Sequence, residues 1–196
     1  MEVQNFVFFG IVGSGKGTQV KLLVEALKAK DSRECVCVGT GELFRKIAKS
    51  AENETQLKVK DQLEAGKLIS DEMTNELVSN VVGLELSPNK HLLFDGYPRT
   101  IPQSEYFENL VKSFERKNIK IIYIELSKEE AMKRNLLRGR HDDTPEGLSQ
   151  RFEEYQNKVI HAMNYFKGME NYTIYAINGE QPVENVHKDI IKALGY

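Results

Sequence analysis

The chain has 196 residues, of which 29% are charged and 40% hydrophobic, and its formal net charge is −2. This length fits one compact α/β domain, and the balanced charge excludes a general attraction to nucleic acid. No apolar run approaches the roughly 20 residues that a helix needs to span a bilayer, and no secretion signal is recognisable. We therefore expect a cytoplasmic globular protein without nucleic-acid or membrane partners.

Five short apolar runs, rich in β-branched and aromatic residues, predict buried strands. They cover residues 3–10, 34–39, 91–96, 119–126 and 172–177. Amphipathic helical stretches lie between the runs, and apolar residues step by threes and fours through 148–166 and 183–194. Because strands alternate with helices and are apolar along their length, we expect a parallel sheet covered on both faces.

The first predicted strand leads into the glycine-rich stretch FFGIVGSGKGTQ (8–19), and a helix follows. This order is typical of a phosphate-binding loop, in which backbone N–H groups and a helix N-terminus surround phosphate oxygens. Lys16 is then expected to reach the β- and γ-phosphates of a nucleoside triphosphate. Gly17 stands where a Ser or Thr hydroxyl usually binds Mg²⁺, and Thr18 comes one place late. An ordinary strand-to-helix turn is the alternative.

The second predicted strand carries the only cysteines, Cys35 and Cys37, which alternation places on one face. Two thiols alone do not complete a structural zinc site. We expect two small buried side chains and no structural zinc.

The second and third predicted strands are separated by about fifty residues, 40–90, which contain helical segments at 42–50, 54–66 and 70–86. A single crossover helix needs much less chain. Part of this segment is therefore expected to stand off the sheet as a small lobe.

The third predicted strand ends at Asp95, and Arg99 follows on the same edge. A carboxylate there suits Mg²⁺ held through water, whereas a helix N-cap or a lysine partner is the alternative. Further along, four arginines gather within eighteen residues: Arg134, Arg138, Arg140 and Arg151. Planar guanidinium groups suit phosphate oxygens, although a solvated helix face is the commoner explanation of such a cluster.

Taken together, the motifs resemble those of the adenylate kinases, in the nucleoside monophosphate kinase family, over nearly the whole chain. Besides the glycine loop and RHDDTPE, they are TGELFR, AGKLISDEM, FDGYPRTIPQ and NGEQPV. The resemblance implies a P-loop three-layer α/β/α fold with a five-stranded parallel sheet. It implies one domain, 1–196, with an AMP-binding helical insertion at about 39–69 and a residual lid at about 138–144. The implied reaction is reversible transfer of the ATP γ-phosphoryl group to AMP, giving two ADP, with Mg²⁺.

The resemblance also assigns roles to individual residues. The ATP site would comprise Gly13, Ser14, Gly15, Lys16, Gly17, Thr18, Arg134, Arg138 and the carbonyl of Gln181. The AMP site would comprise Thr40, Arg45, Lys67, Leu68, Ile69, Gly96, Tyr97, Pro98, Arg99, Gln103, Arg140 and Arg151. The catalytic cations would be Lys16, Arg99, Arg140 and Arg151, and Asp95 would hold Mg²⁺ through water.

Substrate choice depends on Gln103. Pyrimidine monophosphate kinases of the family usually carry asparagine after their DGFPR motif, so Thr100 and Gln103 favour AMP. A UMP or CMP kinase is the runner-up, and a nucleotide-binding regulator without catalysis is the alternative from another class.

The main departure from the family concerns the lid. Members of the family carry a flap between two arginines. In this chain the corresponding arginines are Arg138 and Arg140, and only Gly139 separates them. The sequence leaves open whether the AMP lobe alone or a neighbouring subunit closes the site. It also leaves the oligomeric state open.

Overall fold

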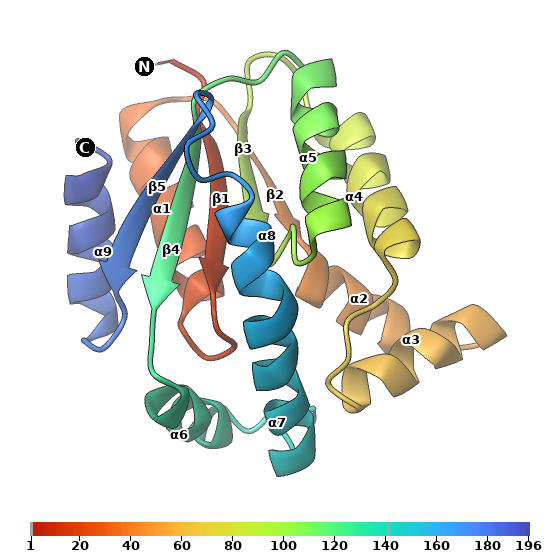
Figure 1. Ribbon diagram of the computed structural model, residues 1–196. Coiled ribbons are helices and arrows are strands. Elements are labelled where there is room, and N and C mark those ends of the chain that lie inside the picture. The colour runs from red at the N-terminus through yellow and green to blue at the C-terminus, as the bar shows by residue number, and fades with distance from the viewer. Residues whose placement is uncertain (1, 141) are drawn as a thin grey trace.

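The computed structural model describes residues 2–140 and 142–196, which form alternating strands and helices (Figure 1). The strands are β1 (Asn5–Gly10), β2 (Cys35–Gly39), β3 (His91–Asp95), β4 (Ile119–Glu125) and β5 (Tyr172–Asn178). The helices are α1 (Lys16–Lys30), α2 (Thr40–Lys49), α3 (Glu54–Glu64), α4 (Asp71–Glu85), α5 (Ile101–Ser113), α6 (Lys128–Arg138), α7 (Pro145–Glu154), η1 (Tyr155–Val159), α8 (Ile160–Asn164) and α9 (Val183–Ala193). Among the helices of the described ranges, none combines the length and the apolar character that a membrane crossing requires.

The five strands form one parallel sheet in the order β2-β3-β1-β4-β5, with β1 at its centre. Each strand begins and ends within two residues of the run predicted from the sequence. All six residues of β1 are buried, as expected for a central strand with covered faces. The predicted five-stranded parallel sheet is confirmed.

Helices cover both faces of the sheet and complete three layers (Figure 1). Val7 and Phe9 of β1 share one core with apolar residues of α4, α5 and α8. Phe6 and Phe8 point to the opposite face and share a second core with α1 and α9. Because successive strand residues alternate between faces, a strand buried on both sides must be apolar throughout. The predicted α/β/α layering is thereby confirmed.

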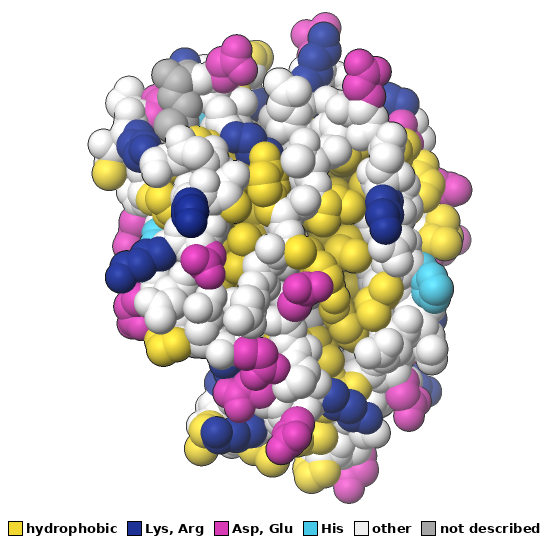
Figure 2. All heavy atoms as spheres, turned by 60° about the vertical axis from the view of Figure 1, so that its left-hand side comes forward, with side chains coloured by type: hydrophobic (Ala, Val, Ile, Leu, Met, Phe, Trp, Pro, Cys, Tyr) yellow, Lys and Arg dark blue, Asp and Glu magenta, His cyan; other side chains and the backbone are white. Residues whose placement is uncertain are grey.

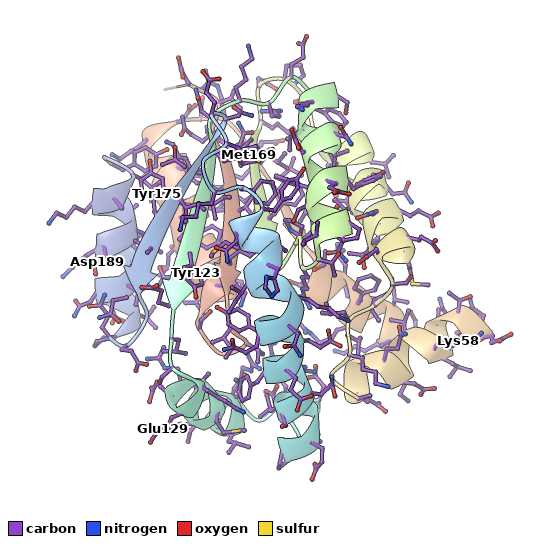
Figure 3. All side chains as sticks on the ribbon, viewed as in Figure 1. Lys58, Tyr123, Glu129, Met169, Tyr175 and Asp189 are labelled. Atoms are coloured by element: carbon purple, nitrogen blue, oxygen red, sulfur yellow. The ribbon has the colours of Figure 1, made fainter. Side chains whose placement is uncertain are left out.

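The long crossover between β2 and β3 divides into two parts. Val78 and Val82 of α4 pack into the core on the sheet. Phe44, Val59 and Ile69, from α2, α3 and the segment after them, form a separate small core. Helix α3 extends away from the sheet, and Lys58 lies on its outer part (Figures 1 and 3). We refer to α2, α3 and the segment to Ile69 as the small lobe.

The helical stretch predicted at 148–166 contains a π-helical turn, η1, between α7 and α8. Tyr155, the first residue of η1, is buried, and its hydroxyl lies 3.0 Å from the hydroxyl of Tyr123 on β4. In Figure 3, Tyr123 lies on β4 next to this column of helices. The apolar spacing continues through η1, so the sequence pattern indicated one uninterrupted helix.

The edge strand β2 corrects the expectation for the cysteines. Cys35 is half-buried and Cys37 is exposed, and both thiols are free. The prediction of two buried side chains is wrong because β2 lies at the edge of the sheet. Val36 and Val38, on the opposite face of β2, are buried against the core that includes α4.

The other edge strand, β5, also exposes part of its surface. Thr173 and Ala176 are exposed, and Ile174 and Tyr175 are half-buried. Figure 2 shows hydrophobic side chains gathered in the middle of the face that carries β5, with charged side chains around them. The polar residues singled out in the sequence lie elsewhere, where β1 and β3 end.

Candidate active site

A cavity of about 490 Å³ lies at the carboxyl edge of the sheet, where parallel sheets bind their ligands. Its walls are the loops after β1 and β3, the small lobe, and helices α6 and α7. Most of the predicted site residues line this one cavity. They are Gly13, Gly15, Lys16, Gly17, Thr18, Arg45, Lys67, Leu68, Asp95, Gly96, Pro98, Arg99, Arg134, Arg138, Arg140 and Arg151.

Glycines shape the loop between β1 and α1. Gly13 and Gly15 have φ angles of 90° and 87°, in the left-handed region that glycine adopts without steric cost. Gly15 is the N-cap of α1, so the unpaired N–H groups of the first helical turn lie at the loop. The ammonium of Lys16 donates to the carbonyls of Gly10, at 2.6 Å, and Ile11, at 3.0 Å. These bonds fix the lysine over the loop.

Asn135 of α6 supports the loop from the interior. Its side chain is fully buried, and its amide donates to the carbonyls of Val12 (3.0 Å) and Ala131 (2.7 Å). A Cβ atom on Gly13 would overlap this amide, so the contact requires glycine. Asn135 lies 123 positions along the chain from Val12, and no local motif marks it.

Positive charge is concentrated in the cavity. The pKa of Lys16 is lowered to about 8, mainly by burial; Asp95 opposes this shift, and three arginines of the lining contribute to it. Burial also lowers the pKa of Arg99, again against the effect of Asp95. Cations that are buried and repel one another gain free energy when an anion enters. The cavity is therefore built to receive anionic groups.

The carboxylate of Asp95, at the end of β3, faces the start of α1. Its Oδ2 lies 3.1 Å from the position that a Cβ on Gly17 would occupy. A serine or threonine at this place would press against the carboxylate. Close packing against Asp95 thus gives a physical reason for Gly17 in the loop.

A second, smaller cavity of about 20 Å³ adjoins the first and shares Lys67, Leu68 and Arg99 with it. It brings in the predicted residues Thr40, Ile69 and Gln103, together with Phe44 and Thr74. The Thr40 hydroxyl donates to the carbonyl of Gly96 at 2.7 Å, and the Arg99 Nε donates to the same carbonyl at 2.6 Å. This carbonyl therefore joins the small lobe to the loop after β3.

The connection from α6 to α7, residues 139–144, brings two carboxylates to the predicted arginines. Arg138 forms a forked ion pair with Asp143, with N–O distances of 2.8–3.0 Å. Arg151 of α7 binds Asp143 at 3.1 Å and Asp142 at 2.6 Å. Burial alone would raise the pKa of Asp142, but Arg151 outweighs this effect and holds the pKa below its usual range. Arg140, an exposed residue, also lines the cavity.

The small lobe contacts α7 directly across the cavity. Arg151 donates to the carbonyl of Leu63 at 3.2 Å. Gly66 has a φ of 71°, and a Cβ there would overlap the carbonyl of Gly147. The short connection therefore lets the lobe and α7 meet without an intervening flap. His141, inside the predicted residual lid, lies outside the described residues.

Three predicted site residues have side chains outside both cavities. Ser14 is buried beneath the loop. Tyr97 is buried in the core and donates to Asn75 at 2.7 Å. Gln181 donates to Asp189 of α9 at 2.6 Å; Asp189 is labelled in Figure 3. The role predicted for Gln181 lies in its backbone carbonyl, and the roles of all three residues stay predictions.

Sequence reasoning also missed residues that line or support the site. The lining includes Leu63, Gly66, Asp142 and Tyr155, and Asp143 holds two of the arginines. The consecutive carboxylates of RHDDTPE, next to an arginine, were a usable signal for Asp142 and Asp143. No comparable signal marks Leu63 or Tyr155.

The sequence is similar to those of known nucleotide-binding enzymes. A family model described as adenylate kinase matches residues 8–171. The chain is 33% identical to the adenylate kinase of Oenococcus oeni over 184 residues, which cover 92% of this chain and 93% of that protein. It is 32% identical to that of Prochlorococcus marinus over 190 residues (95% and 96%) and 31% identical to that of Bacteroides fragilis over 194 residues (97% and 97%).

The matched region contains the glycine loop, Asp95 and the arginines that meet in the cavity. Adenylate kinases are enzymes that transfer a phosphoryl group between ATP and AMP, giving ADP. On the strength of this match and of nearly complete alignment with the relatives, the chain belongs to the adenylate kinase family and is an ATP:AMP phosphotransferase.

Proposed function

We propose that the two sides of the large cavity divide the two nucleotides between them. The glycine loop, with Lys16, Thr18, Arg134 and Arg138, binds the phosphates and base of ATP. Arg45, Lys67 and Arg99 on the opposite side bind the phosphate and ribose of AMP. The observation that carries this assignment is the concentration of buried cations in one cavity, because a triphosphate and a monophosphate anion must be brought together there.

The adenine of AMP is assigned to the region of the smaller cavity, which at about 20 Å³ holds little more than a water and must open to admit a purine. Thr40, Ile69 and Gln103 line it, and it adjoins the residues assigned to the AMP phosphate. On this assignment, the small lobe at about 39–69 is the AMP-binding insertion, and residues at about 138–144 are a residual lid within a single domain, 1–196.

The proposed reaction needs no protein base. A phosphate oxygen of AMP attacks the γ-phosphorus of ATP in line, and ADP leaves. The cations hold the two phosphates at the distance and angle of attack and balance the charge of the transferring group. Arg140 and Arg151 lie between the two nucleotide sides and are assigned to the transferring phosphoryl group. Lys16 and Arg99 neutralise the donor and acceptor phosphates.

The residues present fit a magnesium ion that is held mainly by substrate. Asp95 offers a single carboxylate at the glycine loop, and no hydroxyl stands beside it at Gly17. Within residues 2–140 and 142–196, no group of three or more His, Cys, Asp or Glu side chains is arranged to bind a metal. Mg²⁺ keeps several waters and favours phosphate oxygens, so Asp95 would hold its waters. When bound, the ion neutralises charge on the ATP phosphates. A cytoplasmic location stays a prediction from the sequence.

Two charge-removing variants test the division of the cavity. Lys16→Met should weaken binding of ATP by about 10-fold or more and leave the Kd for AMP nearly unchanged. Arg45→Met should show the reverse pattern, because it removes a cation only from the AMP side. Isothermal titration with each nucleotide separately gives the four values.

Lys58→Met is the matched control. Its side chain is 71% exposed on α3, far from the lining, so both affinities should stay at the wild-type values. The proposal fails if both cavity variants weaken the same nucleotide.

A further inference from the structure

The amide of Gln103 is held in one orientation by two partners of opposite character. The side chain is 1% exposed. Its Oε1 accepts from the backbone N–H of Arg99 at 2.8 Å, and its Nε2 donates to Oδ1 of Asp71 at 2.8 Å. A backbone N–H only donates and a carboxylate only accepts. A flipped amide would set donor against donor and acceptor against acceptor.

Asp71 is itself fixed by its surroundings. The Thr100 hydroxyl donates to the same Oδ1 at 2.9 Å and accepts from the backbone N–H of Gln103 at 3.2 Å. Asp71 is also the first residue of α4, where the helix dipole favours negative charge. Asp71, Thr100, Gln103 and the N–H of Arg99 therefore form one connected network.

Gln103 lines the small cavity, and its amide has one donor and one acceptor beyond those that the network uses. Each amide NH₂ has two hydrogens and each amide oxygen two lone pairs, and the network uses one of each. In a planar amide, one N–H and one lone pair lie parallel on the edge that nitrogen and oxygen share, and a ligand can bond both at once. That pair is complementary to adenine, whose 6-amino group donates and whose neighbouring ring nitrogen accepts.

A 6-oxopurine presents the opposite pattern at the same edge. Its O6 is an acceptor and would face Oε1, and its N1–H would face the amide N–H. Rotating the amide would restore the match only by breaking both bonds of the network. A buried site built to bond one pattern discriminates strongly against a base that leaves its groups unpaired.

We propose that Asp71, with the backbone N–H of Arg99, fixes the Gln103 amide so that the site accepts adenine and rejects 6-oxopurines. Asp71 is a positioning residue, since it acts through Gln103. The assignment rests on the proposed location of the AMP base.

The test compares AMP with IMP, which differs from AMP only in the 6-oxo group and the N1 proton. The ratio of kcat/KM for AMP to that for IMP is measured at saturating ATP. For the wild type we expect about 10³ or more. In Asp71→Asn, the new amide can turn its NH₂ toward Gln103 Oε1, which removes one of the two penalties of the flipped orientation and leaves only that at the N–H of Arg99. The ratio should fall about 10-fold or more, with kcat/KM for IMP rising in absolute terms.

The matched control is Glu72→Gln, which removes a charge from the same helical turn at an exposed position. Its ratio should equal that of the wild type. General damage from either substitution would lower kcat/KM for AMP and for IMP by the same factor and leave their ratio unchanged. An Asp71→Asn ratio within about twofold of the wild type would overturn the proposal.

Two further outcomes complete the design. If the wild type does not prefer AMP over IMP, the proposed location of the AMP base is wrong. If the wild type prefers AMP and Asp71→Asn keeps the full preference, only the role of Asp71 is wrong. If Asp71→Asn does not fold, the Gln103 side-chain NH₂ is followed by NMR in the wild type. Slow exchange of one of its two protons supports the bond to Asp71, and fast exchange of both contradicts it.

Discussion

The glycine loop and the α6–α7 connection face the same cavity but are held by different forces. The loop is fixed by its own backbone, through left-handed glycines, two carbonyl bonds to Lys16 and the buried amide of Asn135. The connection is fixed by charge, through the pairs of Arg138 and Arg151 with Asp142 and Asp143. On the proposed assignment, backbone geometry positions the donor phosphates, whereas side-chain ion pairs position the cations around the transferred group. The two regions should therefore fail in different ways.

The largest effect is expected in the loop. Lys16→Met keeps most of the side-chain volume but removes the charge at the β- and γ-phosphates. Turnover should fall about 10²-fold or more. The fold should persist, because the bonds that are lost are those to the backbone carbonyls of Gly10 and Ile11. Steady-state kinetics with a thermal melt measures both. Near wild-type turnover would show that the loop is not catalytic.

In the connection, Asp143→Asn should damage catalysis and stability together. The substitution weakens the pairing of Arg138 and Arg151, whose side chains are 30% and 17% exposed. Because both arginines keep some contact with water, we expect about 2 kcal/mol lower stability, less than for a fully buried pair. Misplaced cations should lower kcat roughly 10-fold.

Glu105→Gln, at an exposed position of α5, is the control for Asp143→Asn and should change neither quantity. Unchanged kcat in Asp143→Asn would mean that the arginines position themselves without the carboxylate.

The pH profile separates the loop from the connection without mutation. Lys16 is charged below its pKa of about 8 and neutral above it. The kcat/KM for ATP should therefore be constant well below pH 8 and fall about 15-fold between pH 8 and 9.5. Stability has the opposite sign. The unfolded lysine, with a pKa of 10.5, binds more protons between pH 8 and 10.5, so this group's contribution to stability rises there.

A fall in activity without a fall in stability identifies Lys16, and the stability gain should vanish in Lys16→Met. A flat activity profile to pH 9.5 would contradict the assignment.

The smallest effect is expected where the small lobe meets α7. Gly66→Ala places a Cβ against the carbonyl of Gly147 at a φ of 71°, so the two elements must move apart. We expect a loss of about 1–2 kcal/mol in stability and a several-fold higher KM for AMP. Gly83→Ala, on an exposed turn of α4 with no atom near its Cβ position, should leave KM unchanged and raise stability slightly. Equal stability and equal KM for AMP in the two variants would show that the contact between Gly66 and Gly147 contributes to neither quantity.

The features that the sequence predicted correctly are those determined by residues adjacent in the chain. The strands follow from apolar runs, and the glycine loop follows from backbone requirements confined to a few consecutive residues. The rest depends on contacts between distant segments. Asn135 supports the loop from another helix, and Asp71 orients Gln103 from 32 positions away. The exposure of Cys37 depends on the strand order, which places β2 at an edge.

We propose that Gln103 and Thr40 select AMP for phosphoryl transfer at this cavity. The most direct measurement is kcat/KM for AMP, UMP and CMP with ATP as donor. A site built to bond adenine leaves buried polar groups unpaired when a pyrimidine enters. The kcat/KM for AMP should therefore exceed the values for UMP and CMP by about 10³-fold or more. Comparable values for AMP and either pyrimidine nucleotide would contradict the account.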